Sequence, residues 1–212
     1  MTPEAFVASH TAIATAPMVP EIRLHLATEI TPIWQATEAW LEREGVAPPF
    51  WAFAWPGAQA LARRVLDDPA LVHGRRVLDF AAGGGLAAIA CVMAGATAET
   101  AELDPLATAA TNANAALNGV EITTHTGDVV GVPNRWDLIL CGDVCYEAPM
   151  TQHIMPWLRE LARTAEVWIA DPGRAYMPTD GMVKLATYDV PTTLELEDRT
   201  TRTTTIFRLL PA

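Results

Sequence analysis

Hydrophobic and polar residues alternate with two different periods along most of this chain. From residue 57 onward, short apolar runs with the spacing of buried strands alternate with stretches that have the spacing of a helix. The predicted strands cover residues 75–81, 97–103, 121–127, 136–142 and 166–171. The predicted helices cover residues 57–68, 85–95, 105–119 and 148–164.

The last part of the chain has a different pattern. Residues 183–191 and 201–210 are β-rich, and no long helix separates them, which predicts a hairpin at one edge of a sheet. Repeated strand–helix units form parallel sheets with helices on both faces. The sequence therefore predicts an α/β fold with a Rossmann-like, seven-stranded, mostly parallel sheet. Ligands bind such sheets beyond the carboxyl ends of the strands.

The beginning of the chain does not follow this alternation. We expect residues 1–50 to form an N-terminal extension and residues 51–212 to form the main domain. Apolar residues alternate over 21–27, as in a short strand. Residues 31–45 carry the start and stop signals of a helix, with a proline in the first turn and a glycine just past the end.

Composition and charge narrow the class of protein. Half of the 212 residues are hydrophobic, which fits one globular domain. The net charge is −11 and no basic stripe is visible, so nucleic acid is not an expected partner. No apolar run approaches the roughly 18 residues that span a membrane. A monomer is expected.

Targeting signals are also missing from the sequence. The first 22 residues contain neither Lys nor Arg, so neither a secretory nor a transit peptide is expected, and the predicted location is the cytoplasm. Lys184 is the only lysine among 14 basic residues, a bias that a GC-rich, bacterial genome would explain.

The three cysteines are predicted to be buried thiols. Cys91 lies in an apolar helical run, and Cys141 and Cys145 flank an acid with no histidine nearby. The odd number and the spacing favour neither disulfides nor a zinc site. No metal is expected.

A glycine-rich turn follows the first predicted strand of the main domain. In "VLDFAAGGGLAAIA" the strand ends near Asp79, and Gly83, Gly84 and Gly85 lead into a helix. Glycines allow a tight turn and a close approach of a ligand to the backbone. Glu102 ends the next strand, where a carboxylate can bind ribose hydroxyls. This order predicts a nucleoside-containing cofactor.

Two classes of cofactor fit the glycine-rich turn. Read from Gly83 to Ala88, it matches the dinucleotide fingerprint of NAD-binding oxidoreductases. Read from Asp79 to Gly85, it resembles the first motif of class I S-adenosylmethionine-dependent methyltransferases. The turn contains no cation to meet a pyrophosphate, whereas the sulfonium and ammonium of S-adenosyl-L-methionine tolerate the surrounding acids. This charge pattern favours S-adenosylmethionine.

A narrower resemblance begins at "CGDVCYEAPM". Asp143 and Tyr146 form an acid-x-x-aromatic motif that resembles the motif of the family 16 seven-β-strand protein methyltransferases. The stretches "VPEIRLHLATEITPIWQATE", "PPFWAFAWPGAQALAR", "ADPGRAYMP" and "YDVPTT" look like those of the electron transfer flavoprotein β-subunit lysine methyltransferases and their bacterial relatives. The resemblance extends from about residue 19 to the end of the chain.

This resemblance implies where the cofactor binds. Trp55 would line the pocket with Gln59 behind it, Glu102 would hold the ribose, and Asp128 and Val129 would flank the adenine. The full set of expected cofactor-binding residues is Trp55, Gln59, Asp79, Ala81, Ala82, Gly83, Gly85, Glu102, Asp128, Val129 and Gly142.

The chain departs from the family pattern at three positions. Ala81 replaces the first glycine of the usual loop, and Ala58 stands where a second glycine is common, so both mildly crowd the backbone. Glu102 replaces the more usual Asp, which keeps the carboxylate but lengthens its reach.

The aromatic stretch "WAFAW" at residues 51–55 has two interpretations. If it is extended, alternation places Trp51, Phe53 and Trp55 on one face. We expect Trp55 to pack on the cofactor. Trp51 and Phe53 would either wall the substrate entrance or belong to the core.

The expected catalytic residues are Asp143 and Tyr146. A free lysine has a pKa of about 10.4, so the amine arrives protonated and must lose its proton before an in-line attack. Asp143 would receive and orient the ammonium, and Tyr146 would supply a cation–π face or a hydroxyl acceptor.

The resemblance implies a protein lysine methyltransferase that acts on the β subunit of electron transfer flavoprotein. An acidic enzyme suits a lysine-bearing protein through electrostatic steering. Three alternatives stay open: a small-molecule N-methyltransferase of the same fold, an NAD-binding oxidoreductase, and a catalytically silent protein that binds S-adenosylmethionine.

Overall fold

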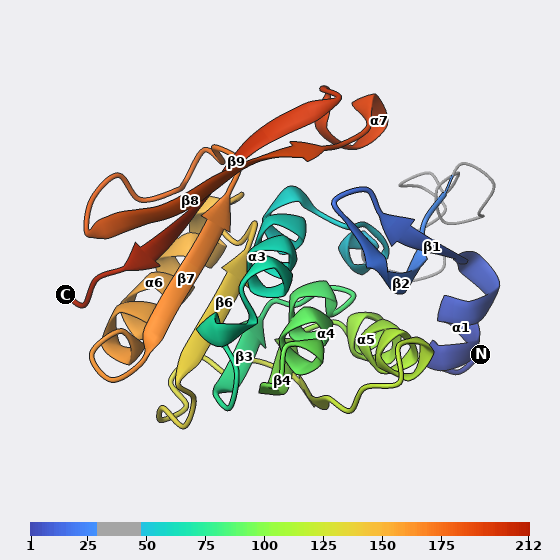
Figure 1. The fold of residues 1–212 in the computed structure, drawn as a ribbon, viewed down its shortest axis with the longest axis horizontal. Helices are drawn as coiled ribbons and strands as arrows, with labels where there is room; N and C mark the ends of the chain where they lie inside the picture. Colours follow the sequence, from blue (N-terminus) through green and yellow to red (C-terminus); the bar gives the residue numbers. More distant parts are fainter. Residues whose placement is uncertain (29–47) are drawn as a thin grey trace.

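A seven-stranded sheet forms the centre of the molecule (Figure 1). The computed structural model describes residues 1–28 and 48–212. The strand order is β5-β4-β3-β6-β7-β9-β8, with β3 to β7 parallel and β9 antiparallel to both of its neighbours. The strands of this sheet are β3 (Arg76–Phe80), β4 (Thr97–Glu102), β5 (Thr123–Thr126), β6 (Leu138–Gly142), β7 (Glu166–Asp171), β8 (Met182–Pro191) and β9 (Thr201–Leu209).

Helices cover both faces of this sheet. In Figure 1, α3 and α4 lie in front of the sheet, and α6 lies behind β7. The longer helices of the domain are α3 (Pro56–Asp67), α4 (Leu86–Met93), α5 (Pro105–Leu117) and α6 (Ala148–Leu161). Shorter helical turns are η1 (Phe50–Ala52), η2 (Pro69–Leu71) and α7 (Leu194–Glu197).

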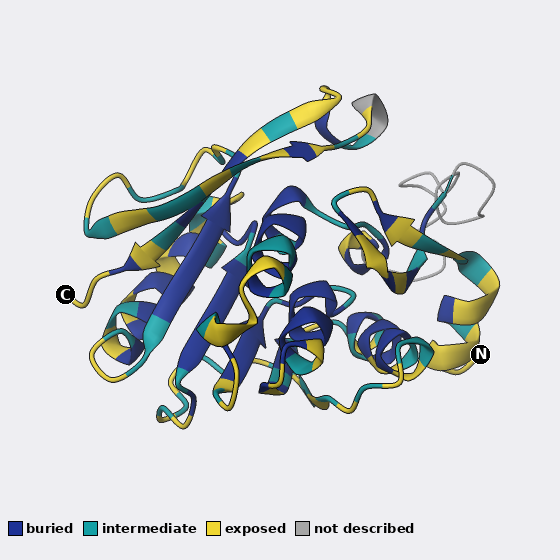
Figure 2. Ribbon diagram, in the orientation of Figure 1, coloured by how far each residue is buried: buried dark blue, intermediate teal, exposed yellow. Residues whose placement is uncertain are grey.

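Successive residues of the central strands pack into two different cores. Val77 of β3 and Leu138 of β6 belong to the cluster that includes α3 and α4, whereas their chain neighbours Leu78 and Ile139 belong to the cluster that includes α6. Side chains of a strand alternate between the faces of a sheet, so a strand covered on both faces is apolar throughout. Figure 2 shows the resulting buried band through β3, β6 and β7.

The predicted α/β fold with a seven-stranded, mostly parallel sheet is confirmed. Each strand and helix predicted after residue 56 overlaps an observed one, and the last two strands form the expected hairpin at the β8 edge. The predicted strand at 21–27 corresponds to β2 (Val19–Leu26). The predicted helix at 31–45 lies outside the described residues. The division at residue 50 stays a prediction.

Two elements near the N-terminus were not expected from the sequence. They are α1 (Pro3–His10) and β1 (Ala12–Ala16), which pairs antiparallel with β2. The β2 backbone is held by side chains of the α5 region, because the amide oxygens of Asn114 and Asn118 accept from the backbone N–H groups of His25 (2.7 Å) and Arg23 (3.0 Å). The hairpin is thereby attached to the main sheet through α5.

The stretch 51–55 is not extended throughout, so the condition for placing Trp51, Phe53 and Trp55 on one face is not met, although Phe53 and Trp55 have extended backbone. Residues 50–52 form a 3-10 turn, closed by a bond from the Ala52 N–H to the Pro49 carbonyl (2.9 Å). A 3-10 helix turns by about 120° per residue, so alternate side chains do not share a face. Trp51 is 2% exposed and belongs to a core cluster with Val7 and Ala110.

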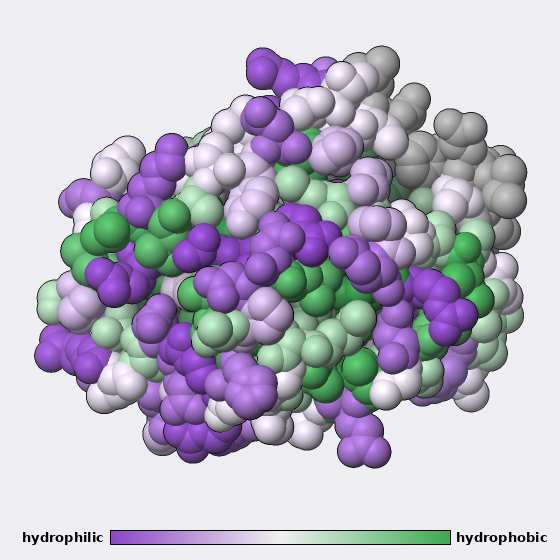
Figure 3. Space-filling model, viewed as in Figure 1, coloured by the Kyte–Doolittle hydropathy of each residue, from purple (hydrophilic) through white to green (hydrophobic). Residues whose placement is uncertain are grey.

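The face of the protein seen in Figure 3 is mostly polar, and the three cysteines are buried. Polar and charged side chains cover much of the face shown in Figure 3, with smaller apolar patches between them. Within residues 1–28 and 48–212, no helix has the length and apolar character needed to cross a bilayer. Cys91, Cys141 and Cys145 are buried free thiols, as predicted.

Candidate active site

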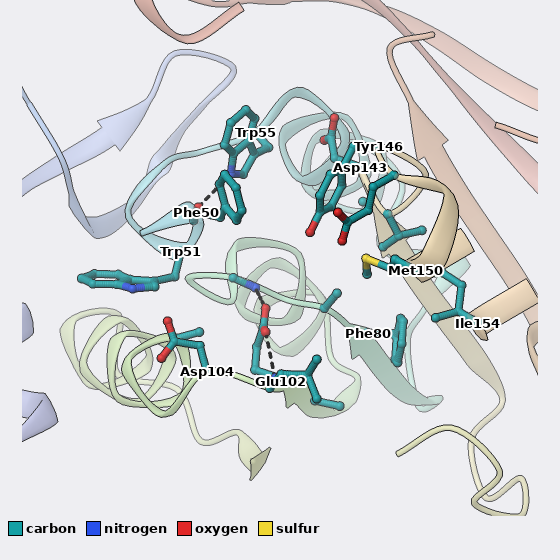
Figure 4. Close-up of a pocket in the computed structure, with 18 of the residues that line it drawn as sticks. Phe50, Trp51, Trp55, Phe80, Glu102, Asp104, Asp143, Tyr146, Met150 and Ile154 are labelled. Carbon is teal, nitrogen blue, oxygen red and sulfur yellow. Dashed lines mark hydrogen bonds between the residues drawn. The ribbon is translucent and has the colours of Figure 1, made fainter. Parts of the chain in front are cut away.

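A cavity of about 770 Å³ lies where β3, β4 and β6 end. Figure 4 shows Glu102 and Asp104 on one side of this cavity and Asp143 and Tyr146 on the other. The structure brings together nine of the residues singled out in the sequence: Trp55, Ala81, Gly83, Glu102, Asp128, Val129, Gly142, Asp143 and Tyr146. They come from segments far apart in the chain, and the ends of adjacent strands bring them together.

The loop after β3 is built from left-handed backbone. Ala81 (φ 54°), Gly83 (φ 56°) and Gly85 (φ 77°) all have positive φ. A Cβ on Gly85 would also lie 2.8 Å from a methyl carbon of Thr111, so glycine is required there for two reasons. Ala81 adopts the same region with a Cβ, which is the backbone cost of its departure from the family pattern.

Glu102 closes this loop from the neighbouring strand. Its Oε1 accepts from the Gly83 N–H (2.5 Å) and its Oε2 from the Leu103 N–H (3.2 Å). Burial raises the pKa of the Glu102 carboxyl, and these two backbone donors oppose the shift. Glu102 thus holds the loop and lines the cavity at the same time.

Asp79 lies beneath the loop and does not line the cavity. It is 3% exposed, and its Oδ2 accepts from the Ala88 N–H at 2.9 Å, which ties β3 to the first turn of α4. Burial raises its pKa to about 7. Asp79 is therefore only partly ionised at neutral pH and would repel a pyrophosphate less than its position in the sequence suggests. The carboxylates that line the cavity itself are the stronger evidence against a pyrophosphate.

Three more of the expected cofactor-binding residues lie behind the cavity wall. Gln59 is 2% exposed and bridges two backbone groups, donating to the Ala54 carbonyl (2.7 Å) and accepting from the Met18 N–H (3.2 Å). Ala82 and Gly85 do not line the main cavity either. For these three residues the structure shows support of the loop and of the segment before α3, and their contact with a cofactor stays a prediction.

Asp128 and His153 form a pair at another part of the cavity. The Asp128 Oδ2 and the His153 Nε2 are 2.7 Å apart, and the Asp128 Oδ1 accepts from the Val130 N–H at 2.9 Å. These two partners lower the pKa of the Asp128 carboxyl. Asp128 was predicted from the sequence, but His153 was not, because it lies on the next helix and belongs to no motif.

Asp143 follows β6 and has a left-handed backbone, with φ 56°, a region that Asp adopts more readily than most residues other than glycine. Its Oδ2 accepts from the Gly57 N–H at 2.5 Å, at the start of α3. Its Oδ1 accepts from Nη2 (2.7 Å) and Nε (3.1 Å) of Arg174. Burial raises the pKa of Asp143 to about 6, against the lowering effect of Arg174. At neutral pH the Asp143 carboxyl is therefore ionised in most copies of the protein.

Arg174 is the principal residue that the sequence analysis missed. It lies in the quoted stretch "ADPGRAYMP", to which no role was given. Its guanidinium lies 5.7 Å from the centre of the Trp55 ring and also pairs with Glu197 (2.5 Å). Its position in a family-specific stretch was the only hint of its role in the sequence, because its partners Asp143 and Glu197 are remote along the chain.

Aromatic rings form one wall of the cavity. The Phe50 ring lies 6.0 Å from the Trp55 ring and 5.9 Å from the Tyr146 ring, and the Trp55 indole N–H donates to the Phe50 carbonyl at 2.7 Å. Trp51 and Phe53 pack in or against the core cluster, although Trp51 also touches the cavity. Of the open alternatives for these two residues, the structure favours the core.

Comparisons with known proteins agree with this geometry. The family model described as "Ribosomal protein L11 methyltransferase (PrmA)" matches residues 60–144. The electron transfer flavoprotein beta subunit lysine methyltransferase of Xenopus laevis is 40% identical over 179 residues, covering 82% of this chain and 71% of that protein. The protein of the same name from Danio rerio is 34% identical over 204 residues, covering 91% and 78%.

Solved structures show the same fold at low sequence identity. A putative RNA methyltransferase from Pyrococcus horikoshii superposes with a TM-score of 0.58 at 17% identity, covering 78% of this chain and 90% of that one. Magnesium protoporphyrin IX methyltransferase from Synechocystis PCC 6803, solved with bound SAH, superposes with a TM-score of 0.52 at 16% identity, covering 74% and 85%.

Proposed function

We propose that this chain, which belongs to the family of electron transfer flavoprotein β-subunit lysine methyltransferases, methylates lysine side chains on the β subunit of electron transfer flavoprotein. The observation that carries the proposal is the cavity, where a carboxylate for the ribose and the acid-x-x-aromatic motif face one space. Family membership identifies the enzyme class and the cofactor, S-adenosylmethionine. The protein substrate is the step that we add.

The charges around the cavity fit this cofactor. The carboxylates that line it are Glu102, Asp104, Asp128, Asp143 and Glu147. Within the described part of the chain, Arg174 is the one permanently charged cation of the lining, and two acids already pair with it. A pyrophosphate needs free cations or helix N–H groups, whereas a sulfonium and an ammonium are compatible with acids. These charges favour S-adenosylmethionine over NAD.

The residues around the cavity divide into two sets. When bound, S-adenosylmethionine supplies an electrophilic methyl group. Glu102 would accept from ribose hydroxyls, and Asp128 and Val129 would flank the adenine. Trp55 would lie against the cofactor. On the opposite side, Asp143 and Tyr146 would receive the target side chain.

The lysine ammonium must lose a proton before it can attack. An ionised Asp143 can accept a hydrogen bond from the ammonium and orient it, while the proton leaves to water. A carboxylate with a pKa of about 6 is charged at neutral pH but is a weak base. Asp143 therefore positions the amine, and Tyr146, 43% exposed at the rim, adds an aromatic face for the cation.

The sequence also bears on the origin, location and oligomeric state of the protein and on the partners that it does not bind. We propose a bacterial, cytoplasmic monomer that binds neither nucleic acid nor membranes. The net charge of −11 supports the absence of nucleic-acid binding, because it disfavours phosphate backbones, and it would steer a lysine-rich protein surface toward the enzyme. Sedimentation of the purified protein measures the oligomeric state.

Mass spectrometry of purified electron transfer flavoprotein tests the substrate. The protein is incubated with S-adenosylmethionine and wild-type enzyme, and in parallel with the Asp143→Asn variant. We expect mass increments of whole methyl groups on lysines of the β subunit with wild type and at most traces with the variant. Unmodified lysines together with methylation of small amines would replace the proposal with a small-molecule N-methyltransferase. Binding of S-adenosylhomocysteine without transfer to proteins or amines would indicate a silent binding protein.

A further inference from the structure

A chain of four charged side chains runs from the cavity into the C-terminal part of the fold. Arg174 bonds to Asp143 on one side (2.7 Å) and to Glu197 on the other (2.5 Å). Glu197 in turn accepts from the Arg202 Nε at 2.9 Å. The side chains of Asp143 and Glu197 are 8% and 1% exposed, so the pairs at the centre of this chain are largely shielded from water.

The backbone of Arg174 is fixed as firmly as its side chain. The Oδ1 of Asp171, the last residue of β7, accepts from the backbone N–H groups of Gly173 and Arg174, both at 2.7 Å. Asp171 is 3% exposed, and its other oxygen, Oδ2, has no partner among the described residues. The turn at 171–174 thus presents the guanidinium in one orientation.

The charges in this region do not cancel. Three carboxylates, Asp143, Asp171 and Glu197, lie with two guanidinium groups, Arg174 and Arg202, which leaves one negative charge in excess. Cys145 and Tyr146 are the neighbouring titratable groups in the chain, and burial raises the pKa of both, so they are neutral. An incoming ammonium group would balance the excess.

We propose that Arg174 is the positioning residue of the amine site: it keeps the carboxylate of Asp143 charged and correctly oriented for the target ammonium, and Glu197 braces it. This inference rests on the proposed function, because it assigns Arg174 a role in presenting the acid of the motif. Arg174 acts through Asp143 and does not itself take part in methyl transfer.

The shape of the arginine side chain explains why this position is not a lysine. The planar guanidinium directs Nε and Nη2 to Asp143 and Nη1 and Nη2 to Glu197, so one group serves two carboxylates. It also lies 5.7 Å from the Trp55 ring centre. An ammonium group has no such planar set of donors, so a lysine at this position would form a well-oriented pair with only one of the two carboxylates.

Removing the guanidinium should change the pH dependence of activity, which a simple loss of structure would not do. Without Arg174, Asp143 would lie in a buried site near the negative Asp171 with only the Gly57 N–H to stabilise its charge. An opposite charge at this distance typically lowers a carboxyl pKa by about 1–3 units. Its loss should therefore raise the pKa of Asp143 and move the acid limb of the activity profile to higher pH.

The test compares Arg174→Met, Arg174→Lys and, as a matched control, Arg163→Met, which removes an exposed arginine paired with Glu160 on α6. Calorimetric binding of S-adenosylhomocysteine first establishes that each variant is folded. The Asp143 carboxyl is then titrated by carbon-13 NMR, with its signal assigned from the Asp143→Asn spectrum. The pH profile of kcat/KM is measured on the same proteins.

We expect Arg174→Met to raise the Asp143 midpoint and the acid limb together by at least about one pH unit. Its activity should be at least about threefold more impaired at pH 6.5 than at pH 9, Arg174→Lys should lie between it and wild type, and Arg163→Met should match wild type. Unchanged midpoints, or an equal loss of activity at every pH, would overturn the inference. The NMR titration needs no methyl transfer, so it still decides the role of Arg174 if wild type modifies no protein lysine.

Discussion

The two sides of the cavity use their acids differently. On the side of β4 and β5, Glu102, Asp104 and Asp128 each accept from backbone N–H groups, and Asp128 also pairs with His153. On the side of β6 and β7, Asp143 accepts from one backbone group and from a guanidinium that a second buried acid shares. The acids of the first side hold backbone segments in place, whereas the contacts of the second side keep the carboxylate of Asp143 charged.

This difference matches two chemical tasks. A nucleoside is bound by shape and by a few hydrogen bonds, so carboxylates that are anchored to the backbone serve it well. A charged amine needs a carboxylate that stays ionised in a dry site, and burial alone would protonate such an acid. The guanidinium of Arg174 opposes that effect.

The largest effect is expected for Asp143→Asn. The substitution removes the charge that meets the ammonium while preserving the shape and an oxygen acceptor for the Gly57 N–H. Loss of one positioned electrostatic contact typically lowers a rate by about 10²–10³-fold. Methyl transfer at saturating cofactor should fall by that factor, while calorimetric affinity for S-adenosylhomocysteine should stay within about threefold. Transfer at the wild-type rate would reduce Asp143 to a structural role at the end of β6.

Glu102→Ala should produce the opposite pattern. Hydrogen bonds to a charged group contribute about 1.5–3 kcal/mol, so the Kd for S-adenosylhomocysteine should rise about 10–100-fold. Transfer at saturating cofactor should change much less. Glu99→Ala is the control, since Glu99 lies on the same strand but pairs with Arg135 away from the cavity. An equal rise of the Kd for S-adenosylhomocysteine in both variants would assign the effect to a disturbance of β4 and not to loss of the ribose contact.

Asp79→Asn should change how stability depends on pH. The folded-state pKa of Asp79, about 7, lies above its unfolded value of about 3.8, so Asp79 favours the folded state at low pH and this contribution is lost as pH rises through 7. Between pH 5.5 and 8 the loss amounts to about 2 kcal/mol. Urea unfolding should show a smaller fall in the free energy of unfolding over this range for the variant. A free energy of unfolding that changes with pH by the same amount in wild type and in the variant would contradict this account.

The smallest effect is expected for Tyr146→Phe. The ring stays beside Phe50, and the cation–π face is kept, so methyl transfer should fall by less than about threefold. Tyr146→Ala removes the face and should raise KM for the protein substrate more than it changes cofactor affinity. A loss for Tyr146→Phe as large as that for Tyr146→Ala would assign the role to the hydroxyl.

The sequence predicted the features that depend on near neighbours or on regular spacing. The central strands β3, β6 and β7 carry apolar residues at successive positions because both faces of the sheet are covered, and this pattern is visible without a structure. Glu102 was found because a carboxylate one β-α unit after the loop meets it at the adjacent strand end, and its bond to the Gly83 N–H spans 19 residues.

Features that depend on remote partners were missed. Arg174 meets Asp143 across 31 residues and Glu197 across 23, and nothing in the local pattern marks either pair. The 3-10 turn at 50–52 was also missed: Trp51 is buried there in a cluster with Val7 and Ala110, residues that lie more than 40 positions away in the chain. The first helix, α1, has no pronounced apolar face and buries only Val7, so periodicity could not reveal it.

A crystal structure with S-adenosylhomocysteine tests the division of the cavity most directly. The account predicts that both ribose hydroxyls lie within about 3 Å of the Glu102 carboxylate and that the sulfur faces the side where Asp143 and Tyr146 lie. The Asp143–Arg174 pair should be intact in that structure. A nucleoside bound against Asp143 and Arg174, with Glu102 left without a ligand contact, would contradict the assignment of the two sides.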